Sequence, residues 1–294
     1  MDFNTFIQMV KDALEERLGG TASVGIHRAM KNNGIVEERI AITRQGCKAA
    51  PLVDLQPYFQ QYQSGQGFDE CISSILEGCR SCEKDMESLQ ETAQGVRDWE
   101  NVKGSVYPFL LSRERNRELL GSVVHKEYLD LAICFYIRFP HHDGIAKIKY
   151  GYLQMWGISL GTLMAQALEN MGHDGYGVIP LGQLVGEMAG EPPMEVDGGL
   201  PMAVLSNKGK MYGAAGMLDT GVLDSYAKAV GGDLYILPSS LHEVILLPAL
   251  GGYVAEQLKA MVSDINSECV PTEDCLSDSV YYYSCSDKTV KLVA

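Results

Sequence analysis

The stretch Asp233-Leu-Tyr-Ile-Leu-Pro-Ser-Ser-Leu-His-Glu-Val-Ile-Leu-Leu-Pro248 belongs to the most apolar part of the sequence. Two runs of aliphatic and β-branched residues flank a Pro-Ser-Ser turn, and this pattern predicts two buried strands joined by that turn. Elsewhere in the chain, hairpin patterns outnumber strand–helix–strand alternations. The sequence therefore predicts an α+β fold of antiparallel hairpins packed with amphipathic helices, and not a doubly wound sheet.

Four further hairpins are expected outward from this stretch, because β-forming runs flank short turn sequences. Their paired runs are residues 22–31 with 35–44, 129–139 with 145–152, 202–205 with 211–215, and 280–285 with 289–293. Apolar residues at helical spacing predict the helices. Their expected ranges are residues 3–18 ended by a left-handed Gly19, 68–99, 160–171 capped by Ser159, 222–230, and a last helix from 253.

The composition changes from charged and helical to apolar and β-branched around residues 101–104. We therefore expect two domains. Residues 1–100 would hold the first helix, the first hairpin and the long helical segment, and residues 101–294 a larger α+β unit that contains the Pro-Ser-Ser-Leu-His-Glu segment.

The overall charge argues against two classes of partner. The chain of 294 residues has 24 basic and 38 acidic residues and a net charge of −14, which repels phosphate backbones and anionic headgroups. The densest basic stretch, residues 113–117, is interleaved with Glu114 and Glu118, which favours a solvated helix face. We expect a protein partner, no nucleic acid and no membrane, and the sequence leaves the oligomeric state open.

No signal peptide and no uninterrupted apolar span is visible, so we expect a cytoplasmic protein. In a reducing compartment the cysteines would be free thiols rather than a disulfide framework. They stand at positions 47, 71, 79, 82, 134, 269, 275 and 285.

The central stretch contains the groups of a hydrolytic triad in Ser239, Ser240, His242 and Glu243. If residues 241–247 form a strand, however, His242 and Glu243 point to opposite faces, and Glu243 cannot orient the ring of His242. The favoured interpretation is structural: the serines satisfy backbone groups in the turn, and His242 and Glu243 make structural hydrogen bonds.

Other patterns give no cofactor or metal site. Cys79 and Cys82 have the spacing of a redox or zinc pair, but acidic helical surroundings disfavour reactive thiolates and no second pair completes a zinc site. Residues 141–143, His-His-Asp, are better explained as a hairpin tip. The acidic residues 264, 268, 273, 274 and 278 lack the spacing of a calcium loop, and Gly213-Ala-Ala-Gly216 matches no nucleotide-binding loop.

Five separated segments carry a resemblance to an uncharacterised bacterial family, abundant in anaerobic gut Firmicutes and classed as a domain of unknown function. The segments are Asn116-Arg-Glu-Leu-Leu120, Tyr128-Leu-Asp-Leu-Ala132, Trp156-Gly-Ile-Ser159, Leu237-Pro-Ser-Ser-Leu-His-Glu-Val244 and Leu276-Ser-Asp-Ser-Val-Tyr281. With the first helix and hairpin, they span nearly the whole chain. The resemblance implies family membership but no activity.

Two functional hypotheses follow, and the sequence does not decide whether the protein is an enzyme. The first is a non-catalytic protein-interaction or accessory factor. The alternative is a hydrolase-like enzyme that uses Ser240, His242 and Glu243, with Asn116 or Asn207 supplied from elsewhere in the fold.

Overall fold

The computed structural model describes residues 1–44, 52–84, 95–139, 144–190, 202–250 and 252–294. Its contacts divide the chain into two compact units. One consists of Met1–Lys31 and Ile35–Gly95, and the other of Asn32–Gly34 and Val96–Ala294. Within the described residues, each sheet lies in one unit and all strand pairs are antiparallel, which confirms the predicted α+β class. The domain boundary expected near residue 101 stays a prediction.

The first unit packs helices on a three-stranded sheet of order β1-β2-β3. The strands are β1 (Ala22–Met30), β2 (Val36–Arg44) and β3 (Leu52–Asp54), and the helices are α1 (Phe3–Leu18), α2 (Gln56–Gln63) and α3 (Phe68–Lys84). The predicted first hairpin is confirmed in register from Ala22↔Arg44 to Met30↔Val36. The left-handed Gly19 (φ 54°) ends α1 as predicted, because glycine adopts this conformation without a Cβ clash.

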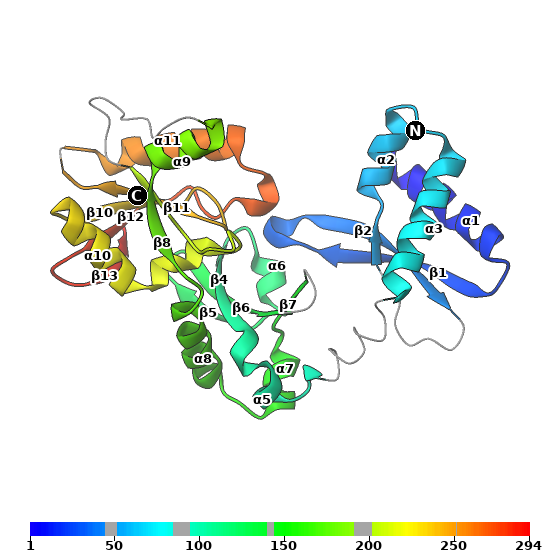
Figure 1. Ribbon diagram of the computed structural model, residues 1–294, viewed down its shortest axis with the longest axis horizontal. Coiled ribbons are helices and arrows are strands. Elements are labelled where there is room, and N and C mark those ends of the chain that lie inside the picture. Colours follow the sequence, from blue (N-terminus) through cyan, green and yellow to red (C-terminus); the bar gives the residue numbers. More distant parts are fainter. Residues whose placement is uncertain (45–51, 85–94, 140–143, 191–201, 251) are drawn as a thin grey trace. The chain divides into compact units, whose positions relative to one another are not determined.

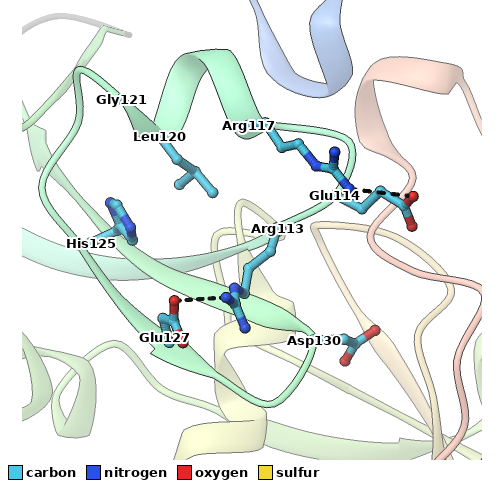
Figure 2. Close-up of a pocket in the computed structure, with 8 residues that line it drawn as sticks. All are labelled: Arg113, Glu114, Arg117, Leu120, Gly121, His125, Glu127 and Asp130. Carbon is cyan, nitrogen blue, oxygen red and sulfur yellow. Dashed lines mark hydrogen bonds and ion pairs between the residues drawn. The ribbon is translucent and has the colours of Figure 1, made fainter.

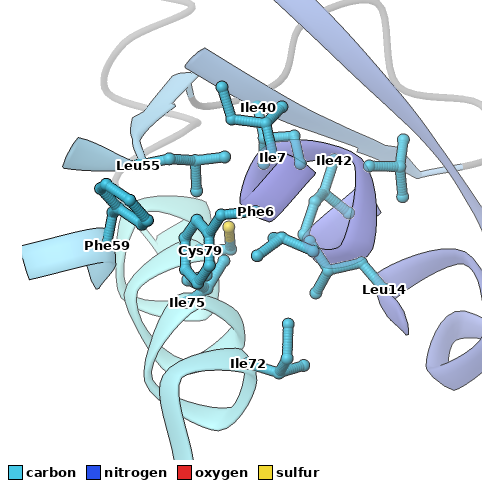
Figure 3. Close-up of a cluster of buried hydrophobic side chains, with 12 residues drawn as sticks. Phe6, Ile7, Leu14, Ile40, Ile42, Leu55, Phe59, Ile72, Ile75 and Cys79 are labelled. Carbon is cyan, nitrogen blue, oxygen red and sulfur yellow. The ribbon is translucent and has the colours of Figure 1, made fainter. Parts of the chain in front are cut away.

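The core of this unit lies between α1, β2, α2 and α3 (Figure 3). Its buried side chains recur at helical spacing on α1 and at alternate positions on β2, as an amphipathic helix on a half-buried sheet requires. They include Phe6, Ile7, Val10, Leu14, Ile40, Ile42, Leu55, Ile72 and Ile75. The predicted helix over residues 68–99 is wrong near its end, because residues 96–98 form a turn before a separate helix begins at Trp99; α3 covers its start as far as Lys84, and residues 85–94 lie outside the described part of the chain.

The smaller sheet of the second unit is built around β6 (Leu131–Arg138), of which the first seven residues are all buried. It pairs with β4 (Val106–Ser112), β5 (His125–Tyr128) and β7 (Ile145–Lys147) (Figure 1). The other elements of this part are α5 (Trp99–Val102), η2 (Lys103–Ser105), α6 (Arg117–Leu120), α7 (Tyr150–Trp156) and α8 (Leu160–Gly172). The short η1 (Asn32–Gly34) follows β1 in the chain but belongs to the second unit by its contacts. The helix α8 packs on β4 and begins as predicted, with Oγ of Ser159 accepting the N–H of Thr162 at 3.1 Å.

The expected strand over residues 145–152 is only partly present. It ends at Lys147, and α7 follows; on one face of α7, Tyr152 and Trp156 are four residues apart and their ring centroids lie 5.2 Å apart in a tilted pair. Nε1 of Trp156 donates to the carbonyl oxygen of Val96 at 2.7 Å. This bond ties α7 to the first residue of the segment Val96–Ala294.

The larger sheet of the second unit has the order β13-β12-β10-β11-β9-β8. Its strands are β8 (Gly177–Pro180), β9 (Ala203–Ser206), β10 (Leu234–Leu237), β11 (Val244–Pro248), β12 (Tyr281–Ser284) and β13 (Thr289–Leu292). The central hairpin β10–β11 and the last hairpin β12–β13 are confirmed. The remaining elements are α9 (Leu181–Ala189), η3 (Gly213–Leu218), α10 (Thr220–Val230), α11 (Ala255–Cys269) and η4 (Thr272–Asp274).

The expected hairpin of residues 202–205 with 211–215 is wrong. The strand β9 instead pairs with β11 and β8, and residues 213–218 form the buried 3₁₀ helix η3. Glycine makes this packing possible, because a Cβ at position 213 would overlap the carbonyl oxygen of His242 and one at position 216 would lie 2.8 Å from the ring of Tyr176. The glycines therefore serve close packing.

Candidate functional site

The Pro-Ser-Ser-Leu-His-Glu segment connects β10 to β11. The strand β11 begins only at Val244, so His242 and Glu243 both lie in the connection and the expected strand over residues 241–247 is wrong at its start. The turn itself closes the connection, because the N–H of Ser240 donates to the carbonyl oxygen of Glu243 at 3.2 Å. His242 and Glu243 are therefore not placed on opposite faces of a strand.

Both ring nitrogens of His242 have a partner. Nδ1 accepts the backbone N–H of Tyr212 at 3.2 Å, and Nε2 lies 3.3 Å from Oδ1 of Asp274. Because Nδ1 is an acceptor, the neutral ring carries its proton on Nε2 and donates it to Asp274. The ring also stacks on that of Tyr212, with centroids 5.8 Å apart. Sequence reasoning missed Asp274 because it lies 32 residues away, in a stretch interpreted only as acidic surface.

The hydroxyl of Ser240 is engaged with a backbone group. Oγ of Ser240 accepts the N–H of His242 at 3.0 Å, the local turn bond that the structural interpretation expects. Ser239 is half-buried in the same connection. The hydroxyl that reaches His242 from another strand belongs to Ser206, which donates to the carbonyl oxygen of His242 at 2.8 Å.

The two asparagines considered as helpers have other partners. Nδ2 of Asn116 donates to Oδ1 of Asn33 at 2.8 Å and to the carbonyl oxygen of Ser112 at 2.9 Å. Nδ2 of Asn207 donates to Oδ2 of Asp174 and to the carbonyl oxygen of Met211, both at 2.9 Å. Neither amide is directed at the imidazole of His242 by these bonds.

A second candidate site is an open depression of about 570 Å³ in the second unit (Figure 2). Its walls come from the segment after β4, from α6 and from β5. The lining residues are Arg113, Glu114, Arg117, Leu120, Gly121, His125, Glu127 and Asp130. The basic stretch 113–117 is thus not the solvated helix face expected from the sequence, because α6 begins only at Arg117 and Arg113 precedes it in a loop.

The inner charges of this depression are compensated within the protein. The guanidinium of Arg113 donates to Oε1 of Glu127 at 2.6 Å and to the carbonyl oxygen of Leu129 at 3.3 Å. Asp130 accepts three hydroxyls, from Ser277 at 3.0 Å, Ser279 at 2.9 Å and Tyr281 at 2.8 Å. Burial raises the pKa of Tyr281, so its hydroxyl stays a donor.

The mouth of the depression carries charges that face solvent. The side chains of Glu114 and Arg117 are 86% and 79% exposed and only 3.8 Å apart at their nearest charged atoms, and that of Glu127 is 66% exposed. An ion pair this exposed contributes little to stability. Glu114 and Arg117 can therefore interact with another molecule, and Glu127 keeps exposed surface beside its bond to Arg113.

The remaining predicted site residues form no recognisable centre. Cys79 is buried in α3, whereas the side chain of Cys82 and residues 141–143 lie outside the description. In the described part of the chain, no three His, Cys, Asp or Glu side chains are grouped to hold a metal ion. Among the same residues, no helix combines the length and apolar character that crossing a membrane requires.

Comparison with known proteins identifies a family. The model of a family of unknown function, DUF5688, matches residues 3–285 and thus nearly the whole chain. Searches of curated proteins and of solved structures found no match. The match confirms the membership that the five sequence segments indicated. The chain belongs to the DUF5688 family of unknown function.

Proposed function

We propose that this protein is a non-catalytic protein-interaction factor, whose partner places a basic segment in the depression beside Arg113. The observation that carries this proposal is the mouth of the depression, where Glu114 and Glu127 are 86% and 66% exposed. With Asp130, the lining carries three carboxylates against the two guanidinium groups of Arg113 and Arg117. Arg113 holds Glu127 in place through a 2.6 Å bond, so one carboxylate is already oriented.

The charge of the whole chain supports the same kind of partner. A net charge of −14 attracts a basic segment at long range and accelerates its encounter with the protein. The depression is open and lined mostly by charged side chains, whereas small-molecule sites are enclosed and mostly apolar. In its composition the depression resembles the polar rim of a protein–protein interface.

The geometry of His242 supports the non-catalytic part of the proposal. A general base needs a ring nitrogen that faces the nucleophile. Here Tyr212 and Asp274 hold both ring nitrogens, and the hydroxyl of Ser240 accepts from the backbone N–H of His242. These bonds serve the connection between two strands.

A synthetic peptide of alternating arginine and glycine provides the direct test. Titrated into the ¹⁵N-labelled full chain, it should shift the amide resonances of residues 113–130 and bind more weakly as salt rises. Glu114→Gln should weaken binding about two- to fivefold, the range of an exposed charge pair. Glu118→Gln is the matched control, because Glu118 is exposed on the adjoining helix α6 but does not line the depression.

Capture of the natural partner uses the Glu118→Gln control and a double variant that combines Glu114→Gln with Glu127→Gln. A partner retained from the host lysate by the wild-type and Glu118→Gln proteins, but lost by Glu114→Gln, Glu127→Gln, would support the proposal. Equal capture by all baits, together with peptide shifts outside residues 113–130, would refute it.

A further inference from the structure

A smaller pocket of about 120 Å³ lies between β8, β9 and the turns that follow β9 and β10. Its apolar wall is formed by Ile179, Leu184 and Val204. Ile179 and Val204 are directly paired across β8 and β9, so their side chains lie side by side on one face of the sheet. Ile179 is 38% exposed although it is aliphatic, and part of this exposed apolar surface lines the pocket.

Three charged side chains border the same pocket: Lys208, Lys210 and Glu243. Within the described residues, none of the three forms an ion pair with another protein group. Lys208 and Lys210 are exposed, and Glu243 is half-buried. The pocket thus combines an aliphatic wall with ammonium groups and a carboxylate that are available to a ligand.

The turn that carries the lysines is rigidly held. Asn207, 5% exposed, brackets it: Nδ2 donates to the carbonyl oxygen of Met211, and Oδ1 accepts the N–H of Met211 at 3.2 Å. Lys210 has a φ of 48°, a left-handed conformation that costs a non-glycine residue energy. The stem of Lys208 lies over Gly175, where a Cβ would come within 2.8 Å of Cδ. These contacts fix the backbone of the turn that carries both lysines before any ligand arrives.

Two bonds couple this turn to the connection that carries Glu243. The hydroxyl of Ser206 donates to the carbonyl oxygen of His242, and the N–H of Tyr212 donates to Nδ1 of the same residue. His242 is thus a positioning residue, because it joins the lysine-bearing turn to the carboxylate-bearing one. The opposite charges are therefore presented on a common scaffold.

We propose that this pocket binds a free α-amino acid with a branched aliphatic side chain. The side chain packs against Ile179, Leu184 and Val204, the α-carboxylate interacts with the ammonium groups of Lys208 and Lys210, and the α-ammonium interacts with Glu243. We expect tight binding to require the side chain, the carboxylate and the ammonium of the ligand, because each contacts a different part of the pocket. This site is independent of the depression beside Arg113.

Three ligands that differ by one group test this assignment on the full chain by calorimetry. L-leucine should bind, whereas 4-methylpentanoate, which lacks the ammonium, and leucinamide, which lacks the carboxylate, should each bind about tenfold more weakly. N-acetyl-leucine distinguishes a free amino acid from a peptide C-terminus. It should bind as weakly as 4-methylpentanoate, and tighter binding than L-leucine would overturn the proposal.

Variants then assign each charge. Glu243→Gln should lower the affinity for L-leucine about tenfold and leave the affinity for 4-methylpentanoate unchanged. The double variant Lys208→Met, Lys210→Met should lower the affinity for L-leucine but not the affinity for leucinamide. Glu256→Gln and Lys259→Met are matched controls, since both residues are exposed on α11. Unchanged leucine binding by Glu243→Gln, or no leucine binding by a wild-type protein with an intact melting transition, would overturn the proposal.

Discussion

Nε2 of His242 lies 3.3 Å from Oδ1 of Asp274, and this contact joins the β10–β11 connection to η4, 32 residues further along the chain. A backbone bond reinforces the link, because the N–H of Leu241 donates to the carbonyl oxygen of Asp274 at 2.7 Å. The contact therefore has the geometry of a structural clamp between two segments. Removal of the imidazole would therefore remove contacts from both Asp274 and Tyr212.

We expect His242→Ala to lower the free energy of unfolding by about 1–3 kcal/mol, because the N–H of Tyr212 loses its acceptor and Asp274 loses its donor. Ser240→Ala should cost less, since water can replace the half-exposed hydroxyl. Thermal unfolding of both variants measures the difference.

A fluorophosphonate probe supplies the opposing test for the same variants. The structural role predicts no labelling of the wild-type protein. Labelling at Ser239 or Ser240 that disappears in a fully stable His242→Ala variant would contradict it and favour the hydrolase alternative.

The carboxylate of Asp233 should make the larger sheet sensitive to acid. The backbone N–H of Cys285 and the hydroxyl of Tyr282, each at 2.7 Å, lower the pKa of Asp233 below its usual value of 3.8. A lowered pKa contributes stability above the unfolded value near 4, and that stability is lost as pH falls through the folded value. Urea unfolding should show Asp233→Asn less stable than wild type at pH 7, with the gap closing below pH 4. A gap of constant size at all pH values would contradict this role.

Gly213 should tolerate no side chain. Gly213→Ala places a Cβ against the carbonyl oxygen of His242 and Oγ of Ser206, so we expect a loss of more than about 3 kcal/mol or failure to fold. Gly172→Ala is the control at the end of α8, where a Cβ meets nothing within 4 Å and should stabilise by about 0.4–1 kcal/mol. Equal melting temperatures of the two variants would refute this account.

The thiols should react at very different rates. Burial raises the pKa of the Cys134 thiol to about 12, whereas Cys269 is exposed at the end of α11. Ellman's reagent should therefore modify Cys269 rapidly and Cys134 only after unfolding. Mass spectrometry after unfolding in alkylating, non-reducing conditions should count eight labelled thiols. A disulfide between Cys79 and Cys82 would contradict the expectation of free cysteines.

Limited proteolysis tests the domain boundary near residue 101. We expect cleavage on the N-terminal side of Val96, because the Nε1 bond from Trp156 and the contact of Trp99 with Trp156, at 5.4 Å between ring centroids, hold residues 96–102. N-terminal sequencing of the larger fragment locates the cut. A chain that resists cleavage at both ends of this region would contradict two separable domains.

Local sequence signals predicted the elements whose partners are near in the chain. The cap at Ser159, the stop at Gly19 and the hairpin around residues 32–34 all depend on neighbours within a few positions. The predicted hairpin of residues 202–205 with 211–215 is wrong, because β9 pairs with β8 and β11 instead. The close packing around Gly213 involves His242, which a local sequence pattern does not include.

The candidate sites were predictable only in part for the same reason. His242 and Glu243 were recognised because they are adjacent in the sequence, but Asp274, Tyr212 and Ser206 join them through the fold. The charged residues of the depression were noticed as a basic stretch. In the structure, Arg113 and Glu114 lie in a loop and Arg117 begins α6. Because α6 has only four residues, hydrophobic periodicity cannot locate its first residue.

The order of the larger sheet has a consequence for synthesis on the ribosome. The strand β9 finds its central partner only after β11 has been translated, some forty residues later, and β12 closes the other side of β10 later still. Lys208 and Glu243 come together when β11 joins β9. A nascent chain released before that moment would lack the proposed amino acid pocket, so ligand binding would report that β11 has paired with β9.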